Sequence, residues 1–301
     1  MDRTQTDMQR NGDRGDSTMK KGMIFVVAVL LMIVWPGTAA SAADLTVRMD
    51  GVTVRTDVAP QLVQNRTMVP LRVLGETMGA EVDWADGRVR LTKGDLEIVL
   101  RPGSRTVLTN GKQSVLDAAP YLYKGRMMVP LRFIGEAFDC TVHFQDRVVS
   151  VRTPPLVIDG QTVASVHREY RMTMGGVIQE MRGHGYHQAL WNVIRAQTGA
   201  RAEEPVFYSW MVHIDLPGAY YKQSRVEFLD AEGNSIRQMD LYGLVRTHQP
   251  EDLAGFPPSL VHDVTAGLWY RMGEQALSEV NRLIGSADRN GFMEILSNTV
   301  V

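Results

Sequence analysis

Apolar and polar residues alternate in two similar stretches of the first half of the chain. Each stretch opens with two short alternating runs, which are separated by Asp50-Gly51 in the first and by Asn110-Gly111 in the second. Asp-Gly and Asn-Gly are strong signals for two-residue turns because these residues accept positive φ angles. The pattern therefore predicts a β-hairpin at the start of each stretch.

A helical pattern follows in both stretches. Apolar residues recur at helical spacing over residues 71–78 and again over residues 131–138. Proline suits the first turn of a helix, where its missing N–H leaves no bond unmade, and Pro70 stands at this point in the first stretch. Gly79 is expected to end the first helix as a left-handed cap, and Asp139 takes that place in the second.

Further alternating runs predict a second hairpin in each stretch, over residues 81–91 and 141–151. Each stretch thus reads as hairpin, short helix and hairpin, with the helix packed on its own small antiparallel sheet. We expect an α+β fold that begins with two tandem units, at about residues 45–100 and 105–153.

The two units are copies of one another at a constant shift of 60 positions, as "MVPLRVLGETMG" from Met68 and "MVPLRFIGEAFD" from Met128 illustrate. A fixed period without gaps indicates duplicated supersecondary units. The phrase also repeats an Arg–Glu pair at helical spacing, Arg72 with Glu76 and Arg132 with Glu136. Such pairs contribute about 0.2–0.5 kcal/mol. An anion-binding arginine is the alternative interpretation.

The phrase "GRMMVPLRFIGEAF", preceded by "NGK" and "APYLY", resembles the copper amine oxidase N-terminal-like domain, or stalk domain, over about residues 45–153. The resemblance implies a non-catalytic extracytoplasmic module of the kind found in tandem in exported proteins of Gram-positive bacteria. In those oxidases the copper site needs a His-x-His pair, which this sequence lacks. The chain is therefore not expected to be an amine oxidase, and no cofactor is predicted.

Pro154-Pro155 marks the expected start of a separate α+β domain over residues 155–301, because proline cannot continue a strand ladder. A third hairpin is predicted at Asp159-Gly160. Periodicity then predicts the remaining elements: helices near 176–196, 258–284 and 286–298, a strand over 205–216, and a hairpin over 225–243.

Several residues of this second half are candidates for chemistry. Glu180, His184, His187, His213 and Asp215 would serve a metal-dependent cell-wall hydrolase if they converged. Their spacing differs from that of the usual His-Glu-x-x-His motif, so satisfied or solvated histidines are the simpler interpretation. No catalytic, cofactor-binding or metal-binding residue is assigned.

Aromatic residues offer another surface: Trp210 with the pair Tyr220-Tyr221 could line a face for sugar or peptide, although packing in the core is the commoner outcome. The single cysteine, Cys140, cannot form an internal disulfide and is interpreted as a small core residue.

The N-terminus has the features of a secretory signal peptide over residues 1–43. Lys20 and Lys21 precede a 13-residue apolar run, and small residues follow. The alternative is an uncleaved anchor. After cleavage no stable membrane span is expected, and the protein would be extracytoplasmic, either secreted or associated with the cell wall.

A net charge of −2 argues against a nucleic-acid partner. We expect a non-catalytic protein of the cell envelope whose stalk-like module is a spacer or an adhesive domain for cell-wall polymer or another envelope protein. A metal-dependent hydrolase in the C-terminal half is the alternative, and ligand sensing in a cleft between the halves is a third possibility.

Overall fold

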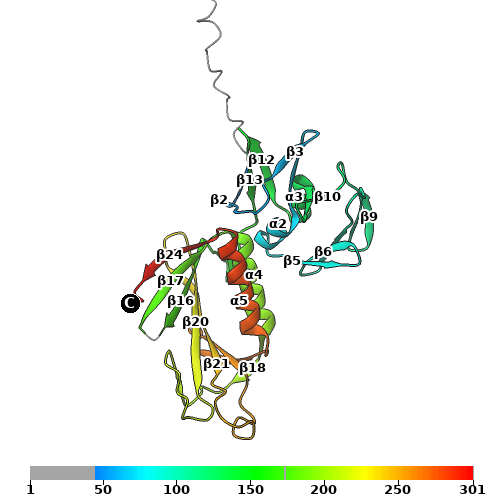
Figure 1. Ribbon diagram of the computed structural model, residues 1–301. Helices are drawn as coiled ribbons and strands as arrows, with labels where there is room; N and C mark the ends of the chain where they lie inside the picture. The colour runs from blue at the N-terminus through cyan, green and yellow to red at the C-terminus, as the bar shows by residue number, and fades with distance from the viewer. Residues whose placement is uncertain (1–44, 173, 301) are drawn as a thin grey trace, which may run out of the picture. The chain divides into compact units, whose positions relative to one another are not determined.

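A computed structural model describes residues 45–172 and 174–300 (Figure 1). The predicted signal peptide lies outside these residues. The described part is an α+β structure with mostly antiparallel sheets and four helices. Residues 44–301 group into one unit by their contacts. None of the four described helices combines the length and the hydrophobicity that a membrane span requires.

The first half of the unit contains three sheets and two short helices, α2 (Leu71–Thr77) and α3 (Leu131–Ala137). The first sheet has the strand order β12 (Thr141–Gln145), β13 (Val148–Arg152), β1 (Thr46–Met49) and β2 (Val52–Thr53). The second has the order β10 (Tyr121–Tyr123), β11 (Arg126–Pro130), β4 (Arg66–Pro70) and β3 (Gln61–Val63). The third has the order β5 (Glu81–Ala85), β6 (Arg88–Lys93), β7 (Leu96–Leu100), β8 (Thr106–Thr109) and β9 (Lys112–Val115).

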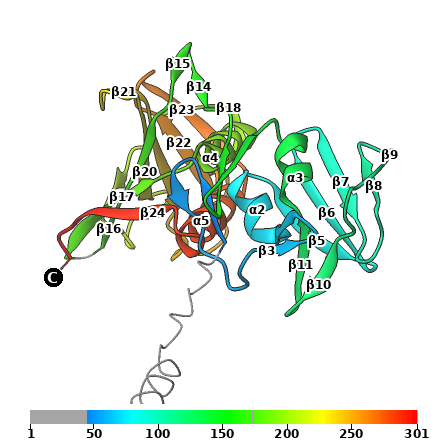
Figure 2. The same cartoon turned by 90° about the horizontal axis from the view of Figure 1, so that it is seen from above.

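The two repeats share these sheets instead of building one each. Strands β4 and β11 pair antiparallel with Val69 opposite Val129, which are equivalent positions of the two repeats. The opening hairpin β1–β2 joins β13 of the second repeat, and the opening hairpin β8–β9 joins β5–β7 of the first. Figure 2 shows β5–β9 as a row of strands beside α2 and α3.

Each helix packs on strands of its own repeat, as expected, and also on a strand of the other. Helix α2 contacts β4 and β5 and, in addition, β11 of the second repeat, while α3 contacts β11 and β12 and, in addition, β4 of the first. Met68 and Met128 lie together in a small core between the repeats. The physical reason is area: a four-stranded sheet made by both repeats covers more apolar surface than a lone hairpin, which is marginal in water.

Local chemistry explains why the helical phrase is repeated. Pro70 and Pro130 end a strand and directly precede the helices, both with φ near −61°. Gly75 and Gly135 allow each helix to approach the next strand, because an added Cβ would lie 2.8 Å from Val82 and 2.6 Å from Val142. These residues serve packing in both repeats.

The second half is one nine-stranded sheet with two helices, α4 (His184–Gln197) and α5 (Ala276–Arg289). Its strands run in the order β18 (Thr198–Ala202), β23 (Leu268–Met272), β22 (Ser259–Asp263), β21 (Ser235–Leu244), β20 (Tyr220–Leu229), β16 (Ser165–Met172), β17 (Gly175–Met181) and β24 (Met293–Asn298), with β19 (Tyr208–Ser209) beside β20. A separate hairpin, β14 (Val157–Ile158) with β15 (Gln161–Thr162), confirms the predicted turn at Asp159-Gly160.

Several predicted elements of this half are wrong. The helix near 176–196 begins only at His184, after strand β17. Residues 258–272 form the hairpin β22–β23 instead of a helix, since β21 offers a partner strand and Gly267 takes a positive φ in the turn. Residues 293–298 form β24, not a helix. The predicted hairpin over 225–243 is confirmed as β20–β21.

The alternating segment over 205–216 is also not a strand. Only Tyr208–Ser209 pair with the sheet, and the apolar side chains nearby remain open to solvent, Val206 at 86% and Met211 at 70%. The nine-stranded sheet is completed by segments far away in the sequence, so the alternation of this stretch is not used for pairing.

The hydrophobic core is continuous between the two halves. Leu71 and Met78 of α2 belong to the same buried cluster as Tyr186 of α4 and Ile284 of α5. An added Cβ on Gly185 would lie 2.2 Å from the carbonyl oxygen of Thr77, so α4 meets the end of α2 at a glycine. The prolines at 154–155 therefore do not mark a break in the core.

Candidate functional site

A cavity of about 740 Å³ opens where the first repeat meets the end of α5. Its walls come from the segment after β2, from α2, from β5 and β6, from the β10–β11 turn and from the last turn of α5. A cavity of this volume falls in the usual range for small-molecule sites. It is the candidate functional site of the protein.

Arginines dominate the charge of this cavity. Four arginines line it, against three carboxylates, and they are Arg55, Arg72, Arg126 and Arg289. All four are exposed. Planar guanidinium groups with several N–H donors bind carboxylates and phosphates in bidentate fashion.

One of the four arginines is already neutralised. Arg126 donates from Nε to Oδ2 of Asp57 at 2.8 Å, and its Nη2 lies 2.5 Å from the same oxygen. Arg66 and Asp117, the equivalent residues, form the reciprocal pair between the repeats. The Arg126–Asp57 pair is therefore one of two equivalent ion pairs that join the repeats.

The helical spacing suggested that Glu76 pairs with Arg72, but Glu76 bonds to other residues. Its Oε2 accepts hydrogen bonds from Oγ of Ser286 at 2.7 Å and from Nδ2 of Asn290 at 3.2 Å. Asn290 also donates to the hydroxyl of Tyr186 at 2.8 Å, and burial raises the pKa of Tyr186 to about 12. Glu76 thus fastens α2 to α5 and α4.

Arg55 is held against the end of α5. Its backbone N–H donates to the carbonyl of Asn290 at 3.0 Å. Its side chain lies along Gly291, where an added Cβ would come within 3.0 Å of Arg55 Cγ. Because Arg289 precedes this turn, Arg55 and Arg289 flank the same end of the helix.

Among the described residues, the side chains of Arg55, Arg72 and Arg289 have no carboxylate partner. Asp83 is the one lining carboxylate that is likewise left unpaired there. Trp84, with 48% of its surface exposed, and Val73 and Leu122 add apolar wall. The arrangement suits a ligand with anionic groups and an apolar or ring portion.

The equivalent charged residues of the second repeat lie elsewhere. Arg132 and Glu136 are exposed, do not line the cavity, and form no ion pair within the described residues. The repeated phrase therefore places the same side chains in two different environments.

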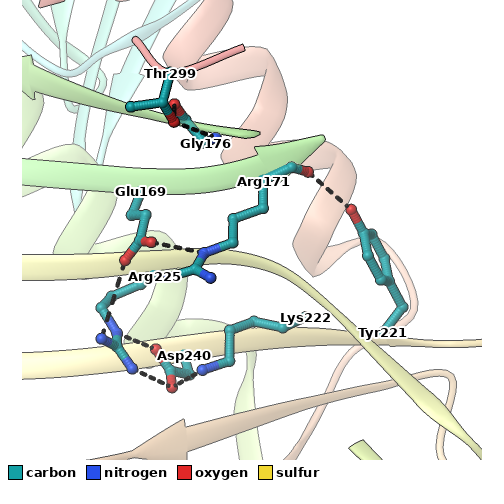
Figure 3. A network of polar contacts seen from close by, with 8 residues as sticks. All are labelled: Glu169, Arg171, Gly176, Tyr221, Lys222, Arg225, Asp240 and Thr299. Carbon is teal, nitrogen blue, oxygen red and sulfur yellow. Dashed lines mark hydrogen bonds and ion pairs between the residues drawn. The ribbon is translucent and has the colours of Figure 1, made fainter. Parts of the chain in front are cut away.

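A second charged cluster lies on the nine-stranded sheet (Figure 3). Asp240, with 3% of its side chain exposed, accepts from Nζ of Lys222 at 2.5 Å and from Nε of Arg225 at 2.9 Å. This hydrogen bond raises the pKa of Arg225. On β16, Oε1 of Glu169 accepts a hydrogen bond from Nε of Arg171 at 3.0 Å. The charges of this cluster satisfy one another, so we assign it to the stability of the sheet.

The proposed metal ligands are not brought together. His213 and Asp215 are exposed between β19 and β20, whereas Glu180 lies on β17 opposite His167. His184 and His187 are neighbours on α4, with ring centroids 5.8 Å apart. Across the described ranges, no three His, Cys, Asp or Glu residues are placed to hold a metal ion.

His187 is a buried structural residue. It is 1% exposed, its Nε2 lies 2.7 Å from the carbonyl of Met181, and burial lowers its pKa to about 4. Cys140 is half-buried, its thiol donates to the carbonyl of Phe138 at 3.5 Å, and burial raises its pKa to about 11. Neither group is poised for reaction.

The aromatic candidates are mostly used in packing. Tyr220 is 2% exposed and donates to the carbonyl of Pro257 at 2.8 Å. Tyr221 donates to the carbonyl of Arg171 at 3.2 Å. Trp210 lies under Lys222, whose Nζ is 4.8 Å from the ring centroid. These three residues do not form a common binding face.

Sequence reasoning found Arg72 but missed the other parts of the cavity. Arg55 is a single cation after a hairpin, and Arg289 closes a helix where a cation is favoured anyway by the helix dipole. No local pattern joins positions so distant in sequence. The repeat offered one signal of the contact with α4. Gly79 and Asp139 are equivalent positions with different residues, and only Gly79 lies against α4.

Comparison with known proteins identifies the first half. Residues 48–153 match the family model "Copper amine oxidase N-terminal domain". The chain is also similar to a "Protease inhibitor" of Brevibacillus choshinensis, with 24% identity over 171 residues, which is 56% of this chain and 52% of that protein. The chain thus spans about half the length of that curated relative.

No solved structure matches the chain. The resemblance of the duplicated phrase to the stalk domain is confirmed by the family match, whose boundaries agree closely with the two repeats. The family match thus accounts for residues 48–153, the segment that holds the two repeats.

Proposed function

We propose that this protein is an exported, non-catalytic binding protein of the cell envelope, which attaches to cell-wall polymer through its copper amine oxidase N-terminal domain. The observation that carries the proposal is the cavity of about 740 Å³ at α2, lined by arginines and apolar side chains. Its unpaired charges are suited to holding a ligand. The signal-like N-terminus supports export.

Cosedimentation with isolated cell wall tests this function. The purified protein should pellet with the wall, and Trp84→Ala should lower the bound fraction because Trp84 forms apolar wall of the cavity. Val115→Ala is the matched control, since Val115 is 69% exposed and lies outside the cavity. Full recovery of the wild type in the supernatant at every salt concentration would refute wall attachment.

A second candidate function is inhibition of a protease, which the name of the relative suggests. The observation in its favour is the exposed apolar segment around β19, in which Val206 is 86%, Met211 70% and Ile214 55% exposed. An exposed apolar segment of this kind is typical of a protein-binding surface. It is independent of the arginine cavity.

Inhibition is measured directly by adding the purified protein to a panel of serine, cysteine, aspartic and metallo-proteases. We expect equimolar protein to lower the activity of at least one class, and Val206→Asp to restore it. Val115→Asp again provides the control. Unchanged activity of every protease at a tenfold molar excess of protein would exclude this candidate.

A further inference from the structure

The cavity is built from two parts of the chain that the family match separates. Arg72 and Trp84 belong to the copper amine oxidase N-terminal domain, whereas Arg289 and Asn290 belong to the C-terminal half. A ligand in this cavity would therefore touch both halves. The domain alone would present only part of the site.

The charges that remain free specify the ligand. Asp57 is taken by Arg126, and Glu76 accepts bonds from Ser286 and Asn290, so neither is placed to neutralise Arg72. The dipole at the end of α5 accounts for Arg289 but not for Arg72, which lies on another helix.

Arg55 lies at the end of α5. Its backbone is bonded to Asn290, and its side chain lies along Gly291. Arg289 lines the same cavity from the last turn of α5, and Arg72 lines it from α2.

We propose that the cavity binds a segment carrying at least two anionic groups, phosphate or carboxylate, with one group held by Arg55 and Arg289 and the other by Arg72. The apolar face of Trp84 would lie against the portion between them. The identification of the ligand's source as a cell-wall polymer rests on the proposed function. The anionic chemistry of the ligand does not.

The test is isothermal titration of the purified protein with inorganic tripolyphosphate and, separately, with citrate. We expect at least one probe to bind, and both Arg72→Gln and Arg55→Gln to weaken it by about 10–100-fold, as expected for losing a hydrogen bond to a charged group. Arg132→Gln, the equivalent change in the second repeat, should leave the affinity within twofold.

Arg72→Lys refines the test, because it keeps the charge but loses the bidentate geometry. Its affinity should fall between those of the wild type and Arg72→Gln. Thermal unfolding confirms that each variant is folded. Binding of neither probe, or equal weakening by Arg72→Gln and Arg132→Gln, would overturn the proposal.

Two further results separate this inference from the proposed function. Cell wall stripped of its phosphodiester-linked polymers by hydrofluoric acid retains its carboxylates, so comparing it with intact wall identifies which anion is bound. Wall binding without binding of either probe would overturn the anion site and leave wall attachment intact. Probe binding with the expected variant pattern, but no wall binding, would support the site and remove the wall as its partner.

Discussion

The first and second repeats carry the same helical phrase in different surroundings. In the first, Glu76 is bonded to Ser286 and Asn290, and α2 lies against α4 and α5. In the second, Glu136 is exposed, and among the described elements α3 packs mainly on β4, β11 and β12. The proline and glycines of the phrase have one role in both repeats, while the charged residues acquire theirs from what lies next to them.

The difference between Gly79 and Asp139 follows from the same contrast. Both residues have positive φ, 78° and 55°. Only at Gly79 would a Cβ meet a neighbour, the carbonyl oxygen of Gly185 at 2.7 Å. A left-handed cap admits aspartate where there is space and requires glycine where another helix approaches.

Exchanging these two residues should give the largest effect. We expect Gly79→Asp to lower the free energy of unfolding by about 3 kcal/mol, because a side chain is forced against the backbone of α4. Asp139→Gly should change it by less than about 1 kcal/mol, since the backbone already fits glycine. Urea unfolding measures both, and similar losses would show that α4 does not distinguish the repeats.

The second-largest effect is expected from acid, which should lower the free energy of unfolding through His187 on α4, the helix that meets the first repeat. The pKa of His187 is lowered to about 4 by burial, against an ordinary value of 6.5. Between these values the unfolded chain binds the proton and the folded chain does not, so stability falls as the pH falls. The expected loss by pH 4 is about 2–3 kcal/mol.

The control for this pH effect lies in the second repeat. His187→Gln should flatten the stability profile between pH 6.5 and pH 4, whereas His143→Gln, at an exposed position on β12, should leave it unchanged. A profile that is identical in the wild type and in His187→Gln would contradict the assignment.

Removing the two glutamates compares the repeats at equal positions. Glu76→Ala deletes the acceptor for Ser286 and Asn290 and should cost about 1.5–2 kcal/mol, because hydrogen bonds to a charged group are lost at a partly buried site. Glu136→Ala should cost less than about 0.5 kcal/mol. Thermal unfolding of both variants decides the matter, and equal costs would mean that Glu76 does not fasten the halves.

The smallest effect is expected at the reciprocal ion pairs. Arg66 pairs with Asp117, and Arg126 pairs with Asp57, all of them about half exposed. Exposed pairs contribute at most about 1 kcal/mol. Asp117→Asn and Asp57→Asn should therefore cause small and equal losses in unfolding experiments, and a large difference between them would break the symmetry of the repeats.

The sequence was sufficient for the elements of the first half because each has its own local signal. The Asp-Gly and Asn-Gly turns, the proline before each helix and the fixed period of 60 all act over a few residues. The partners of these elements could not be predicted. Whether β1 pairs within its own repeat or with β13 depends on contacts about 100 residues apart.

The second half shows where periodicity fails. Residues 258–272 carry apolar residues at helical spacing, but they form a hairpin because a sheet edge is available beside them. The alternation around Val206 predicted a strand, but this segment is mostly exposed because only Tyr208–Ser209 pair with the sheet. The cavity was unpredictable in the same way, since Arg55, Arg72 and Arg289 meet only through tertiary packing.

The crossed pairing of the repeats also bears on how such a domain can arise. Val69 faces Val129, and each opening hairpin completes a sheet of the other repeat. Each repeat alone would leave these strand edges open, so the two copies complete one another within one chain. The duplication also gives the chain two equivalent helices, of which only the first has acquired the bonds to Ser286 and Asn290.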